Sequence, residues 1–294
     1  MQTSEIIKKV RKIEITTRNL VSDLFSGEYH SLFKGQGLEF SEVREYQTGD
    51  SFRQIDWNVT ARHGYPYIKK FEETRELNVM FLIDSSASTL FGTKEYLKSE
   101  FITEITAVLS FSALSNNDKV GLLLFTDEIE KYIPPTKGKK SALRILRDIL
   151  YFEPKKTGTN IKVAVEYIYH LIKKRSIIFV ISDFLDTDYL DSLKILAKKH
   201  DVIAMKIQDK AETELPKAGL LYLKDPESGE LLTINSSNPE LREKYKQKVS
   251  RENEELQETF RKMRIDLLIL ETDKPYVPEL MKFFKFRIRM KNQR

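Results

Sequence analysis

The ten residues from Val79 to Ser88 constrain the fold more than any other part of this chain. Five consecutive apolar residues at the start are typical of a strand buried on both faces, as in a parallel sheet. The run ends in Asp84, Ser86 and Ser88, and a helical pattern begins a few residues later. Open α/β sheets bind ligands at the carboxyl ends of their strands, and these oxygens suit a hard cation such as Mg²⁺. The alternative is a helix start that is rich in capping residues.

Length and composition indicate an ordinary globular protein. The 294 residues suit one large domain or a domain with an appendage, with 40% hydrophobic and 32% charged residues. The net charge is +5, but the two signs are interleaved except at the basic tail from Lys282 to Arg294. This pattern favours a solvated surface over a binding face for nucleic acid or membrane.

The absence of cysteine excludes disulfides, thiolate chemistry and cysteine-ligated zinc. We find neither a signal-peptide core nor an apolar run near the ~20 residues that span a bilayer. A cytoplasmic location is therefore expected.

The first 77 residues predict a helix followed by a small irregular subdomain. Apolar residues three or four apart indicate a packing helix over 3–26. Residues 27–77 crowd charges, glycines and aromatics without a regular period, which predicts turns and short strands. We expect Trp57 to be an apolar anchor, at least partly buried, beside a network of ion pairs. The charged members of this network are Arg44, Arg53, Arg62, Glu39, Glu45, Asp50 and Asp56.

From residue 78 the pattern predicts an α/β domain over 78–294, with a hairpin and long-helix insertion over 208–264. Strands are expected at 79–83, 120–125, 129–133, 177–182, 202–207 and 265–270, and helices at 96–109, 141–150, 161–172, 189–199, 239–263 and 277–286. The prolines Pro134 and Pro135 are expected to end the third strand. Alternating strands and helices with short links predict a doubly wound, mostly parallel sheet.

Two further stretches add oxygen ligands at the same edge of this sheet. Thr159 stands at the head of a helix behind Gly158, which is expected to allow close backbone approach, and Asp183 follows the strand 177–182. Because adjacent strand ends converge, these two residues are expected to meet the three named above. Two carboxylates and three hydroxyls would leave a divalent ion one position for water or an incoming acid.

This set of residues resembles the metal-ion-dependent adhesion site of the von Willebrand factor A fold, Asp-x-Ser-x-Ser followed by a Thr and an Asp. The resemblance covers residues 78 to about 272, where its elements are Asp84, Ser86, Ser88, Thr159 and Asp183. It implies a bound Mg²⁺, or Mn²⁺ or Ca²⁺ in its place, to which a partner protein adds an acidic side chain.

The N-terminal part resembles the signature of the bacterial domain-of-unknown-function family 58. Its residues here are His30-Ser31, Gly35-Gln36-Gly37, Glu39-Phe40, Arg44-Glu45-Tyr46, Gly49-Asp50, Arg53, Ile55-Asp56-Trp57 and Ala61-Arg62. The resemblance implies an adaptor or co-chaperone of a MoxR-type AAA+ ATPase, whose partner is that ATPase or its client. It also implies a second candidate interaction surface on Arg44, Asp50, Arg53, Asp56, Trp57 and Arg62. Many members carry N-terminal membrane helices, which this chain lacks, so at most peripheral membrane association is expected.

Two other function classes fit less well. A haloacid-dehalogenase-like phosphatase needs a second acid where Ser86 stands. Nucleotide hydrolysis lacks its phosphate-binding loop, since the chain has no Gly-x-x-x-x-Gly-Lys-Ser/Thr run. The four histidines are scattered, which disfavours a catalytic triad. Nucleic-acid binding would rest on the basic tail with Phe283, Phe284 and Phe286, which more simply dock a terminal helix. We therefore expect a protein that is not an enzyme and does not bind nucleic acid.

Overall fold

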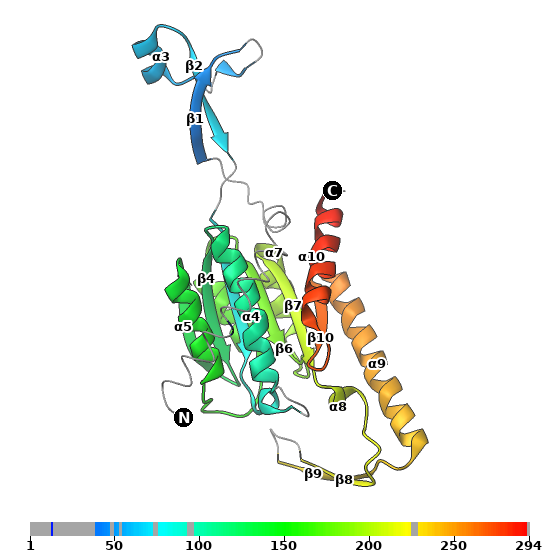
Figure 1. The fold of residues 1–294 in the computed structure, drawn as a ribbon. Coiled ribbons are helices and arrows are strands. Elements are labelled where there is room, and N and C mark those ends of the chain that lie inside the picture. Colours follow the sequence, from blue (N-terminus) through cyan, green and yellow to red (C-terminus); the bar gives the residue numbers. More distant parts are fainter. Residues whose placement is uncertain are drawn as a thin grey trace.

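The computed structural model describes residues 13, 39–47, 50–52, 55–72, 76–92, 97–224 and 229–292, and its centre is a six-stranded sheet (Figure 1). The strand order is β10-β7-β6-β3-β4-β5, and every neighbouring pair is parallel except β4 and β5. The strands are β3 (Asn78–Asp84), β4 (Lys119–Phe125), β5 (Ile129–Thr136), β6 (Ile177–Ser182), β7 (Asp201–Gln208) and β10 (Asp266–Glu271). The predicted α/β class and mostly parallel sheet are confirmed.

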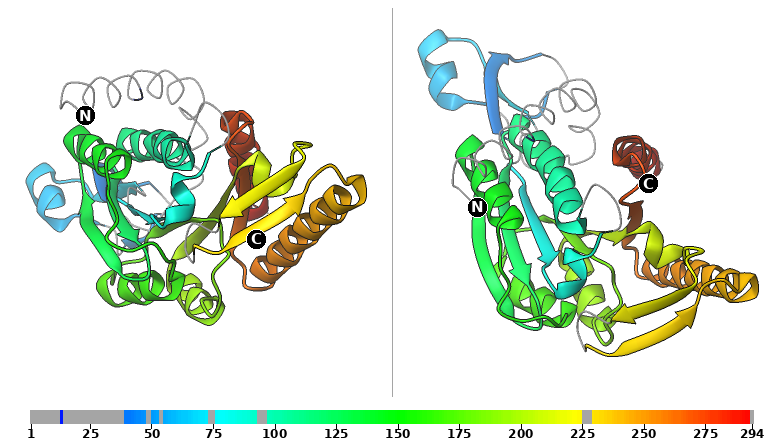
Figure 2. Two further views of the ribbon diagram at one scale, coloured as in Figure 1. Left: turned by 90° about the horizontal axis from the view of Figure 1, so that it is seen from below. Right: turned by 60° about the horizontal axis from the view of Figure 1, so that its bottom comes forward.

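Helices cover both faces of the sheet (Figure 2, left). In β3, Val79, Phe81 and Ile83 face one core, while Met80 and Leu82 face the other. The first core is closed by α4 (Lys98–Ser115), α5 (Lys139–Leu150) and α10 (Tyr276–Asn292), and the second by α6 (Ile161–Leu171), α7 (Leu190–Lys199) and the end of α9 (Pro239–Lys262). Because the side chains on both faces of β3 are buried, the strand has to be apolar throughout. This explains its run of consecutive apolar residues.

The strand β5 is longer than expected, because it continues through Pro134 and Pro135 to Thr136. Proline has no N–H to donate, so within sheets it is confined to edge strands and bulges. β5 is the outermost strand of the sheet, and its pairing with β4 is irregular between Val120 and Leu122. The two prolines therefore do not interrupt the strand.

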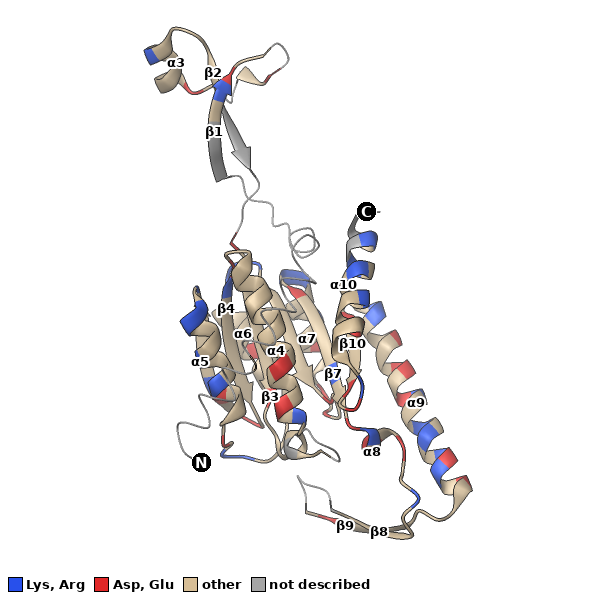
Figure 3. Ribbon diagram, viewed as in Figure 1, with Lys and Arg blue, Asp and Glu red and all other residues tan. Residues whose placement is uncertain are grey.

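The expected hairpin and long helix form an arm. The hairpin strands are β8 (Leu220–Lys224) and β9 (Leu231–Asn235), and α8 (Lys210–Thr213) precedes them. The helix α9 starts at its cap Asn238 and buries only Phe260 among its residues. Its exposed length carries both charge signs (Figure 3). Within the described residues, no helix combines the length and apolar character that crossing a bilayer requires.

The terminal helix α10 docks against the sheet as expected, although one of the three phenylalanines named for this role, Phe286, is 61% exposed. Phe284 is buried in the first core. Arg287 is also buried and pairs with Asp201 at 2.6 Å and with Asp266 at 2.9 Å. Part of the basic excess of the tail therefore neutralises acids at the amino ends of β7 and β10.

The N-terminal subdomain consists of an antiparallel pair, β1 (Glu39–Glu45) and β2 (Tyr67–Glu72), with the helix α3 (Trp57–His63). It precedes the amino end of β3 and projects beyond the sheet in Figure 1. Within the described residues, Arg44 and Asp50 of the expected network form an ion pair, in which Arg44 binds both carboxylate oxygens at 2.9 and 2.7 Å. Asp56 caps α3 by accepting hydrogen bonds from the backbone N–H groups of residues 58 and 59.

The expected burial of Trp57 is wrong, because its side chain is 68% exposed. It is the first residue of α3, and among the described side chains of the subdomain Ile55 and Ile68 are the buried ones. Arg62 is exposed as well. Arg53 and the expected helix over 3–26 lie outside the described residues, apart from Ile13, which packs near Ala107 and Leu146.

We predict that Gly121→Ala destabilises the fold by about 1–3 kcal/mol, as overpacking of a core does. A Cβ on Gly121 would overlap Met80 Sδ and come within 2.9 Å of two backbone atoms of β5, Ile133 O and Pro135 N. Gly158→Ala is the control, since its Cβ would meet only Asp127 Cβ at 3.8 Å. Urea denaturation measures both, and equal losses would contradict the packing argument.

Candidate metal site

The sequence-predicted site lies where three loops meet at the carboxyl end of the central strands. Asp84 is the last residue of β3, and Ser86 caps the short 3-10 helix η2 (Ala87–Leu90). Thr159 lies just before α6, and Asp183 directly follows β6. Between their first and last residues β3 and β6 are apolar, so polar side chains appear where these two strands end.

Asp84 is the centre of the hydrogen bonds in this site, and it is buried. Its Oδ1 accepts from the backbone N–H of Ser86 at 2.9 Å, and its Oδ2 accepts from Ser182 Oγ at 2.8 Å. Thr159 Oγ1 lies 3.5 Å from the same Oδ2, a long contact for a hydrogen bond. The carboxylate is therefore held by three different segments of the chain.

Burial raises the pKa of Asp84 to about 6, and the nearby charge of Asp183 adds to this effect. The hydrogen bonds from Ser86 and Ser182 lower the pKa and offset only part of it. The buried carboxylate of Asp84 thus lies near a second acid, Asp183, and the ionised form of Asp84 is disfavoured. A cation between them would remove that penalty.

The serine loop is fixed by its own backbone. Ser86 Oγ and Ser88 Oγ lie 3.0 Å apart, and Thr89 Oγ1 donates to Ser86 O at 2.8 Å. The backbone N–H of Ala87 donates to Thr157 O at 3.1 Å. This hydrogen bond ties the loop that carries Ser86 and Ser88, the serine loop, to the loop that carries Thr159. The two serine hydroxyls therefore lie together, and that of Ser86 also hydrogen-bonds to Asp84.

Asp183 acts on Asp84 through its negative charge rather than by hydrogen bonding to it. It is half-buried, and its Oδ2 lies 3.9 Å from the ammonium of Lys98. The structure thus links Asp84, Ser86, Ser88 and Thr159 by direct contacts and places Asp183 beside them.

Two members of the site were missed from the sequence. Ser182 is the last residue of β6, and a hydroxyl beside the expected acid was the available signal. Lys98 left no signal, because a lysine at the start of a helix is usually exposed, whereas this one is buried. The role expected for Gly158 is wrong, since a side chain there would meet only ordinary contact.

The oxygen atoms present fit a small hard cation. Mg²⁺ prefers six oxygen ligands and keeps several waters, so two carboxylates and three hydroxyls are a suitable set. Across the described residues there is no group of three or more His, Cys, Asp or Glu side chains that could hold a metal. Any ion here would depend on hydroxyls and water beside the two acids, which disfavours the softer transition metals.

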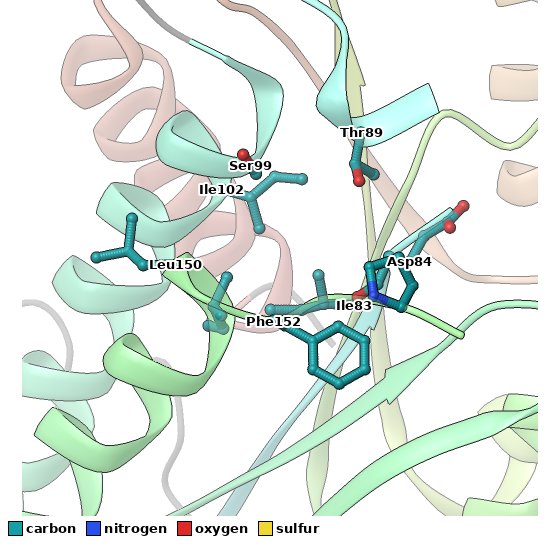
Figure 4. Close-up of a pocket in the computed structure, with 10 residues that line it drawn as sticks. Ile83, Asp84, Thr89, Ser99, Ile102, Leu150 and Phe152 are labelled. Atoms are coloured by element: carbon teal, nitrogen blue, oxygen red, sulfur yellow. The ribbon is translucent and has the colours of Figure 1, made fainter. Parts of the chain in front are cut away.

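A cavity of about 40 Å³ lies next to the site, between the loop and the helices α4 and α5. Figure 4 shows Asp84 and Thr89 on one side of it and Ile102, Leu150 and Phe152 on the other. This volume holds one or a few water molecules and is far below the ~300 Å³ of a small-molecule site.

Comparison with known proteins gives the following matches. The family described as "Protein of unknown function DUF58" matches residues 42–255. An uncharacterised protein of Mycobacterium tuberculosis is 28% identical over 283 residues, which are 95% of this chain and 89% of that protein. The solved structure of an aerotolerance-related membrane protein from Bacteroides fragilis aligns with a TM-score of 0.50 at 18% identity, over 73% of this chain and 99% of that one. That likeness concerns the fold alone.

We predict that Asp84→Asn stabilises the metal-free protein above pH 6. The folded pKa of about 6 exceeds the ordinary 3.8, so the native state keeps a proton that the unfolded chain releases. Wild-type stability therefore falls as the pH rises from about 4 to 6, by about 3 kcal/mol at 1.36 kcal/mol per unit. The amide of the Asp84→Asn variant does not titrate, so the variant does not lose this stability as the pH rises.

Urea denaturation with EDTA at pH 4 and pH 7 measures the difference between the two proteins. Asp127→Asn changes an exposed acid of the neighbouring loop and is the control. A gap between Asp84→Asn and the wild type that does not widen with pH would contradict the burial penalty.

Proposed function

Because the chain belongs to the DUF58 family, whose description gives no activity, we propose a function from the site itself: metal-dependent binding of a partner's acidic side chain. The observation that carries this proposal is the buried carboxylate of Asp84, which is surrounded by hydroxyls and has its pKa raised to about 6. When bound, a divalent cation would supply the positive charge that draws a carboxylate to an otherwise acidic rim.

Each residue has a defined part in this proposal. Asp84 and Asp183 would hold the cation, and the hydroxyls of Ser86, Ser88 and Thr159 would complete its ligands or orient its waters. Ser182 would keep the Asp84 carboxylate in place through its 2.8 Å hydrogen bond. The fold and this set of residues together support assignment of residues 78–272 to the von Willebrand factor A type.

We further propose that the chain is an adaptor or co-chaperone of a MoxR-type AAA+ ATPase. An adaptor needs two separate binding surfaces, and the fold offers two. The metal site lies at the carboxyl end of β3, whereas the N-terminal subdomain joins its amino end. Three large aromatic side chains are exposed on that subdomain, Phe52 at 72%, Trp57 at 68% and Tyr65 at 72%. The family resemblance is what points to the ATPase as one of the two partners.

An enzymatic role is less well supported by the site. Among the described histidines, His200 is buried and its Nδ1 accepts from Ser176 N at 3.2 Å, at the opposite end of the sheet. Burial lowers its pKa to about 4, so it is neutral. Ser86 stands where a phosphatase of the dehalogenase type needs a general acid.

We predict that the chain binds the MoxR-type ATPase of its own organism only in the presence of a divalent ion. Binding should be measured by calorimetry with purified proteins in 5 mM Mg²⁺ and in EDTA. Asp84→Ala and Ser86→Ala should both abolish it, because each removes a cation ligand. Thermal unfolding with and without Mg²⁺ reports metal binding independently, since binding only to the native state raises the melting temperature.

Asp127→Ala, on the adjacent exposed loop, is the matched control and should bind normally. Equal binding with and without metal, in a protein that still folds, would exclude the metal site from this interaction. Loss of that binding in Trp57→Ala would then identify the subdomain as the interaction surface.

We predict that the isolated chain does not hydrolyse ATP, phosphate monoesters or carboxylic esters. The physical reasons are the lack of a phosphate-binding loop, the missing second acid and the small cavity. Turnover that requires metal and disappears in Asp84→Ala would overturn this prediction and make the hydrolase the better assignment.

A further inference from the structure

The side chain of Lys98 is an unusual feature beside the proposed metal site. It is 1% exposed, although it is the first residue of α4. A cation is disfavoured at a helix N-terminus, and a buried ammonium is costly unless it is paired. Its Nζ lies 2.5 Å from Glu212 Oε1 and 3.9 Å from Asp183 Oδ2. The lysine therefore bridges a proposed metal ligand and a second acid.

That second acid is firmly held by the arm of the protein. Glu212 Oε2 accepts from the backbone N–H of Asp209 at 2.8 Å as part of a capping box on α8. Its carbonyl oxygen accepts from Tyr245 Oη of α9 at 3.0 Å. Glu212 can thus keep Lys98 paired without any contribution from Asp183.

We propose that Lys98 is an internal cation of the site, which balances Asp183 when metal is absent and is retained by Glu212 when metal binds. The inference rests on the proposed function, since it assumes that Asp183 is a metal ligand. A divalent ion on Asp183 would repel the nearby ammonium, and this repulsion is only weakly screened where water is scarce. Lys98 is therefore a positioning residue that sets the affinity of the site for metal.

The surrounding charges agree with this role. Lys206 of β7 is also buried, and the charges of Asp183, Glu252 and Glu212 act on it. In the described part of the chain, Lys98 rather than Lys206 comes within 4 Å of Asp183. The acids at this edge are shared between the two lysines, so loss of one cation leaves an excess of negative charge.

Two substitutions should change metal affinity in opposite directions. Lys98→Met keeps the length of the side chain and removes its charge, so Mn²⁺ should bind about tenfold more tightly. Glu212→Gln leaves Lys98 with Asp183 alone, so Mn²⁺ should bind several-fold more weakly. Titration calorimetry of the full chain with Mn²⁺ measures both. A merely structural role would weaken binding in both variants.

The exposed ion pair between Lys246 and Glu214, at 2.6 Å on the arm, provides matched controls. Lys246→Met and Glu214→Gln should leave Mn²⁺ affinity unchanged. If Lys98→Met does not fold, the Mn²⁺ affinity of Glu212→Gln alone tests the proposal. Lys98→Arg should then bind Mn²⁺ as tightly as the wild type does.

Failure of this inference is distinguishable from failure of the proposed function. Wild-type binding of Mn²⁺ that Asp84→Ala abolishes, together with unchanged or weaker binding by folded Lys98→Met, overturns only the role of Lys98. A wild-type chain that binds no Mn²⁺ overturns both.

Discussion

The site depends on one unfavourable interaction, the burial of the Asp84 carboxylate at the end of the central strand. Its neighbours in the sheet bring Asp183 close on one side, and the serine loop closes over it from the other. Hydrogen bonds from Ser86 and Ser182 hold the acid but do not restore its ordinary pKa. Proteins retain a destabilising buried charge mainly at sites where the charged group has a role other than stability. The sheet, the helices and the loops that surround Asp84 are all arranged so that this charge stays in place.

The two ends of the sheet have different chemistry. At the amino end, the buried side chains of His200 and Arg287 each have specific partners. His200 accepts from a backbone N–H there, and Arg287 pairs with two acids. At the carboxyl end, Asp84 and Asp183 repel each other, and a buried lysine offsets only part of their charge. The apolar strands between the ends separate these regions by the length of β3. Substitutions at the amino end are therefore expected to act on stability, and those at the carboxyl end on binding.

The order and type of the elements in the α/β domain were predictable, because buried parallel strands have to be apolar and helices have to be amphipathic. The positions of the proposed ligands Asp84, Ser86 and Ser88 were predictable for the same reason, since a polar cluster directly after such a strand has a fixed place. Lys98 and Glu212 were not, because 114 residues separate them and no local pattern marks a lysine for burial. The predicted burial of Trp57 was wrong because a single tryptophan is usually an apolar anchor. Among the described side chains of this small subdomain, Ile55 and Ile68 are buried instead.

The two prolines of β5 have a consequence for how other chains can approach. An exposed edge strand invites a foreign strand to extend the sheet through its free N–H and C=O groups. Pro134 and Pro135 have no N–H to offer a foreign strand, and Lys131 places a charged side chain on β5. At the opposite edge, α9 and α10 both pack against β10. Lateral growth of the sheet is thereby discouraged on both sides, so a partner is directed to the ends of the strands, where the loops are.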